Sequence, residues 1–237
     1  MPVMLNRFAV VLLIAGALSA AAARPAEAQQ TMNLLVGRVM LPSEGRAPAD
    51  ILLIEHADLE FEISDFNGPT LGGEWLVPLG DRLEAGASVS FWRHTVNAVH
   101  ARIVDTDGSD LPRTMTLRQT PAAITVRYLP LSQSYRVQPY AGGGLVITNW
   151  SFTESGNFIE PPRRIFRDEK FSAIGNALGP IFVFGMRLVG DSVAYGIEGR
   201  YHRSRGAFGP IFAHVQAPDI DLGGWTLQAT AGLRFGE

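Results

Sequence analysis

The chain has 237 residues, no cysteine and a formal net charge of -3 at pH 7. Without cysteine it has neither a disulfide scaffold nor a thiolate zinc site, and no long run of Lys and Arg indicates a nucleic-acid partner. Only one long apolar run is present, at the start, which excludes a helical membrane protein with several spans.

That apolar run predicts a signal peptide over residues 1–28. Arg7 supplies a positive charge, residues 8–22 are apolar, and Ala26-Glu27-Ala28 fits the small-x-small cleavage rule, so we expect cleavage after Ala28 and export. A membrane anchor is the alternative, but the run is short for a span of about 20 residues. Residues 29–50 form a lead of undecided structure, in which 33–41 can be read as a strand, a short helix or a periplasmic segment.

From residue 51 onward, apolar and polar side chains alternate with the period of two that is typical of strands. In the last segment Trp225, Leu227 and Phe235 fall on one face and Gln228 and Arg234 on the other. The first segment places Ala57, Leu59, Phe61 and Ile63 on one face. The eight predicted strands are 51–66, 70–78, 83–95, 114–129, 135–152, 180–189, 193–206 and 222–235.

The connections alternate in length. Those at 79–82, 130–134 and 190–192 are short, and those at 96–113, 153–179 and 207–221 are long; the first hairpin, at 67–69, is short where a long loop is expected. Short periplasmic turns and long external loops are typical of outer-membrane barrels. The sequence therefore predicts an all-β fold: one antiparallel up-and-down transmembrane β-barrel of about eight strands over residues 51–237.

Aromatic residues gather near both sets of connections, as in the two girdles of a membrane barrel. The first group lies near the short turns or the C-terminus and comprises Tyr128, Tyr135, Tyr195 and Phe235. The second lies near the long loops and comprises Trp92, Trp150, Phe152, Tyr201 and Trp225. A soluble barrel or sandwich, with the apolar face inward, is the alternative. The export signal, the girdles and the loop rhythm favour the membrane barrel.

Two stretches carry a family resemblance. Residues 140–144, Tyr-Ala-Gly-Gly-Gly, are similar to the aromatic-Gly-x-Gly strand of small outer-membrane barrels, and residues 221–235 are similar to their final strand. The chain thus resembles the porin-like outer-membrane β-barrel group related to OmpA and OmpW. The resemblance implies location in the cell outer membrane, contact with outer-membrane lipid and insertion by the barrel-assembly machinery. These proteins often end on an aromatic residue, whereas here Gly236 and Glu237 follow Phe235.

If the apolar face meets lipid, the other face lines the lumen. It carries three carboxylates, four guanidinium groups and one imidazole, from Glu74, Glu84, Arg127, Arg187, Glu198, Arg200, His202 and Arg234. An eight-stranded barrel is just wide enough for side chains to fill, and buried charges must be paired. We therefore predict an internal ion-pair network that plugs the lumen; the alternative is a gated or narrow polar pathway.

Three weaker patterns remain. Residues 202–204 resemble the His-x-Ser motif of barrel lipid A deacylases, but Arg205 stands where Asn is expected, and His202 and Ser204 face inward rather than toward lipid. Asp105, Asp107 and Asp110 surround a Gly turn as in a calcium loop, yet the distal Glu is missing, so a solvated turn is favoured over a metal site. A basic group in an external loop is able to contact lipopolysaccharide phosphates; it comprises Arg163, Arg164, Arg167 and Lys170.

These patterns favour a structural or interaction protein of the outer membrane that uses no cofactor. The second hypothesis is a narrow channel for small or hydrophobic solutes. The third is a lipid A-modifying hydrolase that uses His202 and Ser204.

Overall fold

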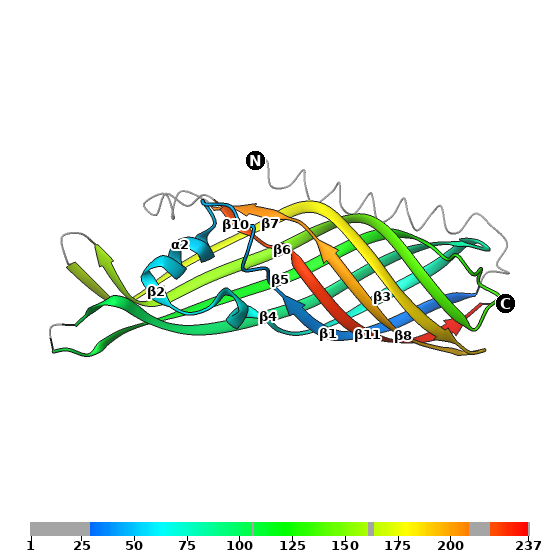
Figure 1. Cartoon of the computed structure of the whole chain (residues 1–237), viewed down its shortest axis with the longest axis horizontal. Helices are drawn as coiled ribbons and strands as arrows, with labels where there is room; N and C mark the ends of the chain where they lie inside the picture. The colour runs from blue at the N-terminus through cyan, green and yellow to red at the C-terminus, as the bar shows by residue number, and fades with distance from the viewer. Residues whose placement is uncertain (1–28, 106, 161–163, 209–218, 237) are drawn as a thin grey trace.

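A computed structural model describes residues 29–105, 107–160, 164–208 and 219–236. Eight long strands of this part form a ring (Figure 1), in which every strand is antiparallel to both neighbours. They are β1 (Gln30–Met40), β3 (Gly68–Gly80), β4 (Leu83–Val104), β5 (Asp110–Tyr128), β6 (Val137–Glu160), β7 (Arg164–Val189), β8 (Val193–His202) and β11 (Gly224–Phe235). Pairing of β1 with β11 closes the ring, so these strands leave no open edge. The predicted all-β, up-and-down barrel is confirmed.

The prediction of a strand over 51–66 is wrong. These residues form α2 (Ile51–Asp58), the two-residue β2 (Leu59–Glu60) and the 3-10 helix η1 (Ile63–Phe66). Asp50 caps α2 by accepting a hydrogen bond from the Leu52 amide, which favours a helix start there. The barrel's first strand is instead β1, inside the segment left undecided. The connection before β3 is therefore the long stretch 41–67, and the short first hairpin does not exist.

Two predicted long loops are also mostly strand. The connections at 96–113 and 153–179 contain the paired upper parts of β4, β5, β6 and β7. Together with β2 and α2, these four strands extend the end of the barrel that lies opposite the C-terminus (Figure 1). Short β9 (Arg205–Ala207) and β10 (Asp219–Asp221) pair with each other after β8.

Exposed apolar side chains form a belt around the part of the barrel nearer the C-terminus. On β4 they continue to Phe91 and on β6 to Leu145, which the half-buried Ile147 follows; the next outward side chains are Arg93 and Asn149. The strand segments beyond this boundary are called the upper wall: residues 93–104, 110–118, 149–160 and 164–176. No helix in the described ranges is long and apolar enough to cross a membrane.

The aromatic side chains divide differently from the prediction. Tyr128, Tyr135, Tyr195 and Phe235 are exposed near the short turns. At the other boundary Tyr201 and Trp225 point outward, with ring centroids 4.9 Å apart. The assignment of Trp92, Trp150 and Phe152 to a girdle is wrong, since all three are buried inside the barrel.

Those inward aromatics belong to an apolar core that fills the barrel mouth. Residues 41–67, called the mouth loop, insert Ile51, Leu52 and Phe66 toward Trp92 and Phe152 on the barrel strands. Burial of this apolar surface holds the loop in the mouth. The barrel thus has an apolar upper tier and, as described next, a charged lower tier.

Candidate functional site

Four charged side chains from three strands meet in the lower lumen. Glu74 on β3, Arg127 on β5 and both Glu198 and Arg200 on β8 make up what we call the luminal network. Each guanidinium contacts both carboxylates, at N–O distances of 2.5–2.8 Å. All four side chains are almost fully buried. The network therefore joins β3 and β5 to β8 across the interior rather than along the wall.

Neutral partners add further hydrogen bonds to these charges, although the buried Arg127 Nε has no partner in the described part of the chain. The Tyr140 hydroxyl and the Gln228 amide each donate to Glu198 at 2.8 Å. Asn33 on β1 donates to Glu74 at 3.3 Å. The Arg127 guanidinium lies 4.7 Å from the centroid of the Tyr140 ring. Buried charges are tolerated where such partners satisfy them.

A second buried ion pair joins Arg187 on β7 to Glu84 on β4. Arg187 also donates to the side-chain oxygen of Gln138 at 2.8 Å. The two groups together contain six of the eight luminal side chains expected from the sequence. Period-two alternation identifies their inward direction, but it does not indicate which inward residues reach each other across the lumen.

The remaining two predicted residues take no part in the ion pairs of the described chain. Arg234 is only half-buried, near the short turns, and donates to the Gly190 carbonyl at 2.6 Å. His202 lies at the end of β8, and its Nε2 has no hydrogen-bond partner in the described part of the chain. The luminal assignment of Asn33, Gln138, Tyr140 and Gln228 was missed from the sequence. For Gln138, Tyr140 and Gln228, the position in the alternating pattern of a predicted strand indicates an inward side chain. Asn33 lies in residues 29–50, for which the sequence predicts no single structure.

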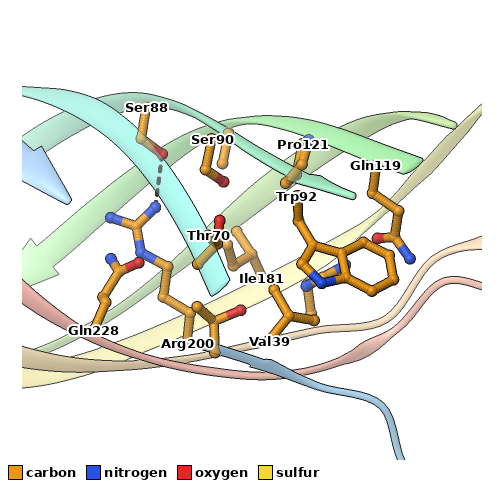
Figure 2. A pocket seen from close by; sticks show the side chains of 13 residues that line it. Val39, Thr70, Ser88, Ser90, Trp92, Gln119, Pro121, Ile181, Arg200 and Gln228 are labelled. Atoms are coloured by element: carbon orange, nitrogen blue, oxygen red, sulfur yellow. Dashed lines mark hydrogen bonds between the residues drawn. The ribbon is translucent and has the colours of Figure 1, made fainter. Parts of the chain in front are cut away.

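A small cavity lies between the luminal network and the apolar tier. It has a volume of about 30 Å³ and is lined by Ser88, Ser90, Trp92, Gln119, Arg200 and His202, among others. Figure 2 shows Arg200 beside Gln228 and hydrogen-bonded to Ser88, with Trp92 and Gln119 farther along the lumen. Buried nitrogens of Trp92, Gln119 and His202 lack partners among the described atoms. The space suits one or two water molecules, because a water needs roughly 10–15 Å³ and several polar partners.

The structure does not assemble a nucleophile from His202 and Ser204. The Ser204 hydroxyl lies 3.4 Å from the Thr148 hydroxyl, and no hydrogen bond joins it to the His202 ring within the described ranges. Both side chains are buried inside the barrel. A serine nucleophile needs an oriented base beside it, and this arrangement lacks one.

The three aspartates of the possible calcium loop do not converge. Asp105 pairs with Arg167 at 2.6 Å, and Asp107 accepts hydrogen bonds from the Ser109 amide and hydroxyl at 2.9 and 2.6 Å. Asp110 is exposed at the start of β5. No group of three or more His, Asp or Glu residues able to hold a metal occurs in the ranges that the structure describes. Asp107 therefore stabilises the turn through Ser109, whereas Asp105 joins the segment to β7.

The residues of the predicted basic group also have different surroundings. Arg167 takes part in the ion pair with Asp105, and Lys170 is exposed on β7. Arg163 and the Arg164 side chain lie outside what the structure describes.

Two buried ion pairs hold the mouth loop in place. Arg46 pairs with Asp50 at 2.9 Å and donates to the Asp221 carbonyl, while Asp50 accepts from the Asp221 amide. Glu55 on α2 pairs with Arg113 on β5 at 2.5 Å. The loop is thus tied both to β10 and to the upper wall.

Glu154 lies close to the Glu55–Arg113 ion pair, in the upper wall and outside the belt of exposed apolar side chains. Burial, together with the nearby Glu55 carboxylate, raises the pKa of Glu154 to about 8, although Arg113 opposes this shift. Its Oε1 is buried without a hydrogen-bond partner in the described part. The Arg113 guanidinium therefore lies near two carboxylates, those of Glu55 and Glu154. The folded state is most stable when Glu154 is protonated.

No family model and no curated protein matches the chain. Neisserial surface protein A is similar in structure, at 11% identity and a TM-score of 0.50, with 90% of this chain and 100% of that chain covered. The N-terminal β-barrel domain of Pseudomonas aeruginosa OprF (11% identity, TM-score 0.45) is matched over 88% of this chain and 100% of its own length. Ail of Yersinia pestis (9% identity, TM-score 0.45) is matched over 88% and 99%. The chain has the fold of the small outer-membrane β-barrel proteins.

Proposed function

We propose that the chain is an outer-membrane barrel with a structural or interaction role, in which the barrel serves as a closed anchor. The observation that carries this proposal is that two layers of side chains, one charged and one apolar, fill the lumen. The four charges of the luminal network pair across the interior, and the mouth loop adds an apolar core above them. An eight-stranded barrel leaves no room for a wide pore once its interior is packed.

The belt of exposed apolar side chains and the exposed tyrosines near the short turns support placement in a bilayer. On this proposal residues 1–28 direct export and are removed after Ala28, and the barrel-assembly machinery inserts the remainder. On the same proposal, its partners are outer-membrane lipid and lipopolysaccharide.

Cell fractionation combined with heat-modifiable gel mobility tests this placement. We expect the full chain, expressed in a Gram-negative host, to be recovered with the outer membrane and to migrate differently before and after boiling, because a folded barrel resists detergent. Recovery in the soluble periplasmic fraction with a single mobility would contradict it.

A narrow channel is the second candidate, and the cavity beside Arg200 favours it. Its unpartnered nitrogens from Trp92, Gln119 and His202 are able to hold water. The cavity lies between two packed tiers, so this candidate requires the mouth loop or the luminal network to move. The hydrolase hypothesis gains no support from the positions of His202 and Ser204.

A further inference from the structure

We propose that Arg93 and Arg118, on the outer face of β4 and β5, form a binding site for a phosphate group of an outer-leaflet glycolipid. This inference rests on the proposed membrane placement and adds a defined lipid site to it. It uses none of the residues of the basic group predicted from the sequence near residues 163–170.

The two arginines are direct cross-strand neighbours. Arg93 on β4 is paired in register with Arg118 on β5. Both side chains are exposed on the outer surface of the barrel. Directly opposite residues of an antiparallel pair have Cβ atoms about 4.5–5.5 Å apart. One anion is therefore within reach of both guanidinium groups.

Neither arginine has a charged partner in the part of the chain that the structure describes. Among the described residues, no ion pair or hydrogen bond involves the side chain of Arg93 or Arg118. By contrast, the exposed Arg102 pairs with Asp58, and the exposed Arg167 pairs with Asp105. Like charges placed directly opposite each other destabilise a sheet. A bridging anion would convert this repulsion into two charge-assisted contacts.

The position on the barrel indicates which anion is available. Outward side chains of β4 are apolar up to Phe91, and those of β5 are apolar from Tyr128 back to Ala122. Arg93 and Arg118 follow at the change from apolar to polar side chains, where lipid headgroups meet the protein. A ligand here would place acyl chains against Phe91 and Ile124, both about half-exposed, and its charged head against the arginines.

The chemistry favours a phosphate over a zwitterionic head. A planar guanidinium binds phosphate oxygens through two parallel hydrogen bonds, and Arg is over-represented wherever phosphate is recognised in this way. On the side away from the lipid belt, the Thr95 and Thr116 hydroxyls lie 2.9 Å apart. They add neutral hydrogen-bonding groups for sugar or phosphate oxygens.

The test compares lipid affinity of purified, folded variants in micelles of a neutral detergent. The probe is bis-phosphorylated lipid A, titrated and followed by native mass spectrometry. We expect Arg93→Gln and Arg118→Gln each to weaken binding about tenfold, as the loss of one charged contact predicts. Arg38→Gln is the matched control, because Arg38 is an exposed arginine on β1 whose register partners are Pro69 and Leu227. Its affinity should stay close to that of the parent.

Three outcomes would overturn the site. If Arg38→Gln lost as much lipid affinity as the two test variants, the effect would be one of general interfacial charge. Equal binding of dephosphorylated lipid A, or full displacement by millimolar inorganic phosphate, which would indicate a free-ion site, would also contradict it. Heat-modifiable mobility is measured on every sample. A parent protein without it would refute the membrane barrel and the site together, whereas folded variants with unchanged affinity would refute the site alone.

Discussion

At the scale of single residues, charge burial separates two kinds of arginine. Arg200 is enclosed and holds two carboxylates of the luminal network. Arg102 pairs with Asp58 in a solvated position, with side-chain exposures of 73% and 64%. Removing one member of a buried pair leaves an uncompensated charge, at a cost of about 3–5 kcal/mol. A surface pair contributes roughly 0–1 kcal/mol.

We therefore expect Arg200→Ala to lower the free energy of unfolding by about 3–5 kcal/mol, and Arg102→Ala by no more than about 1 kcal/mol. Urea titration of both variants in the same detergent measures the difference. Equal midpoints would mean that the luminal network is solvated rather than buried. Arg234→Ala should resemble the surface variant, since among the described residues Arg234 is half-buried at the rim and donates to a backbone carbonyl rather than to a carboxylate.

Alternation in the sequence predicts the direction of a side chain but not its depth in the barrel. Alternation alone indicates that Glu74, Glu198 and Arg200 point inward. Height along the barrel depends on strand tilt and register, which the sequence does not display. That is why Arg234 and His202 were grouped with charges that they do not contact.

At the scale of elements, the mouth loop has the alternation of a strand without forming one. Leu59, Phe61 and Ile63 alternate with polar residues, as in a strand, yet the alternation arises in a short segment that turns its apolar side chains into the barrel mouth. The Asp50 cap followed by four apolar residues, Ile51 to Ile54, was the signal of a buried helix start.

The Glu154 site predicts how the mouth loop responds to pH. The pKa of Glu154 is raised by folding, so its contribution is fully favourable below the ordinary carboxyl value of about 4.3 and declines as pH rises toward the folded value of about 8. Hydrogen exchange of the α2 amides, corrected for intrinsic rates, should show protection falling between pH 5 and about 8. Glu154→Gln should flatten this slope.

Asp58→Asn is the matched control for that experiment, because Asp58 is an exposed carboxylate at the end of α2. It should retain the slope of the parent. An unchanged slope in Glu154→Gln would mean that another group governs the loop.

At the scale of the whole molecule, one feature of the sequence marks the membrane boundary. On β4 the apolar side chains occupy odd positions up to Phe91 and even positions from Trp92 through Val96 and Ala98. The phase of the strand is continuous, but the polarity of its two faces is exchanged. On the proposed membrane placement, lipid surrounds the barrel below the boundary and water surrounds it above, so the apolar face turns inward to meet the mouth loop.

This exchange explains which parts of the architecture were predictable. Strands inside the membrane show apolar-out alternation and short turns, and these predicted the closed ring. The upper wall reverses the rule, so its sequence lacks the apolar-out alternation and predicts loops at 96–113 and 153–179. The same reversal accounts for Trp92, Trp150 and Phe152, which were assigned to a lipid-facing girdle although their phase points inward.

The central claim, that the barrel is a closed anchor, is tested most directly by its conductance. The luminal network and the mouth loop both obstruct the interior, and wide aqueous pores arise only at about 16–18 strands. The purified full-length barrel, shown to be folded by heat-modifiable mobility and inserted in a planar bilayer, should carry no large, stable, ohmic current. A persistent porin-sized current through the protein would contradict the account.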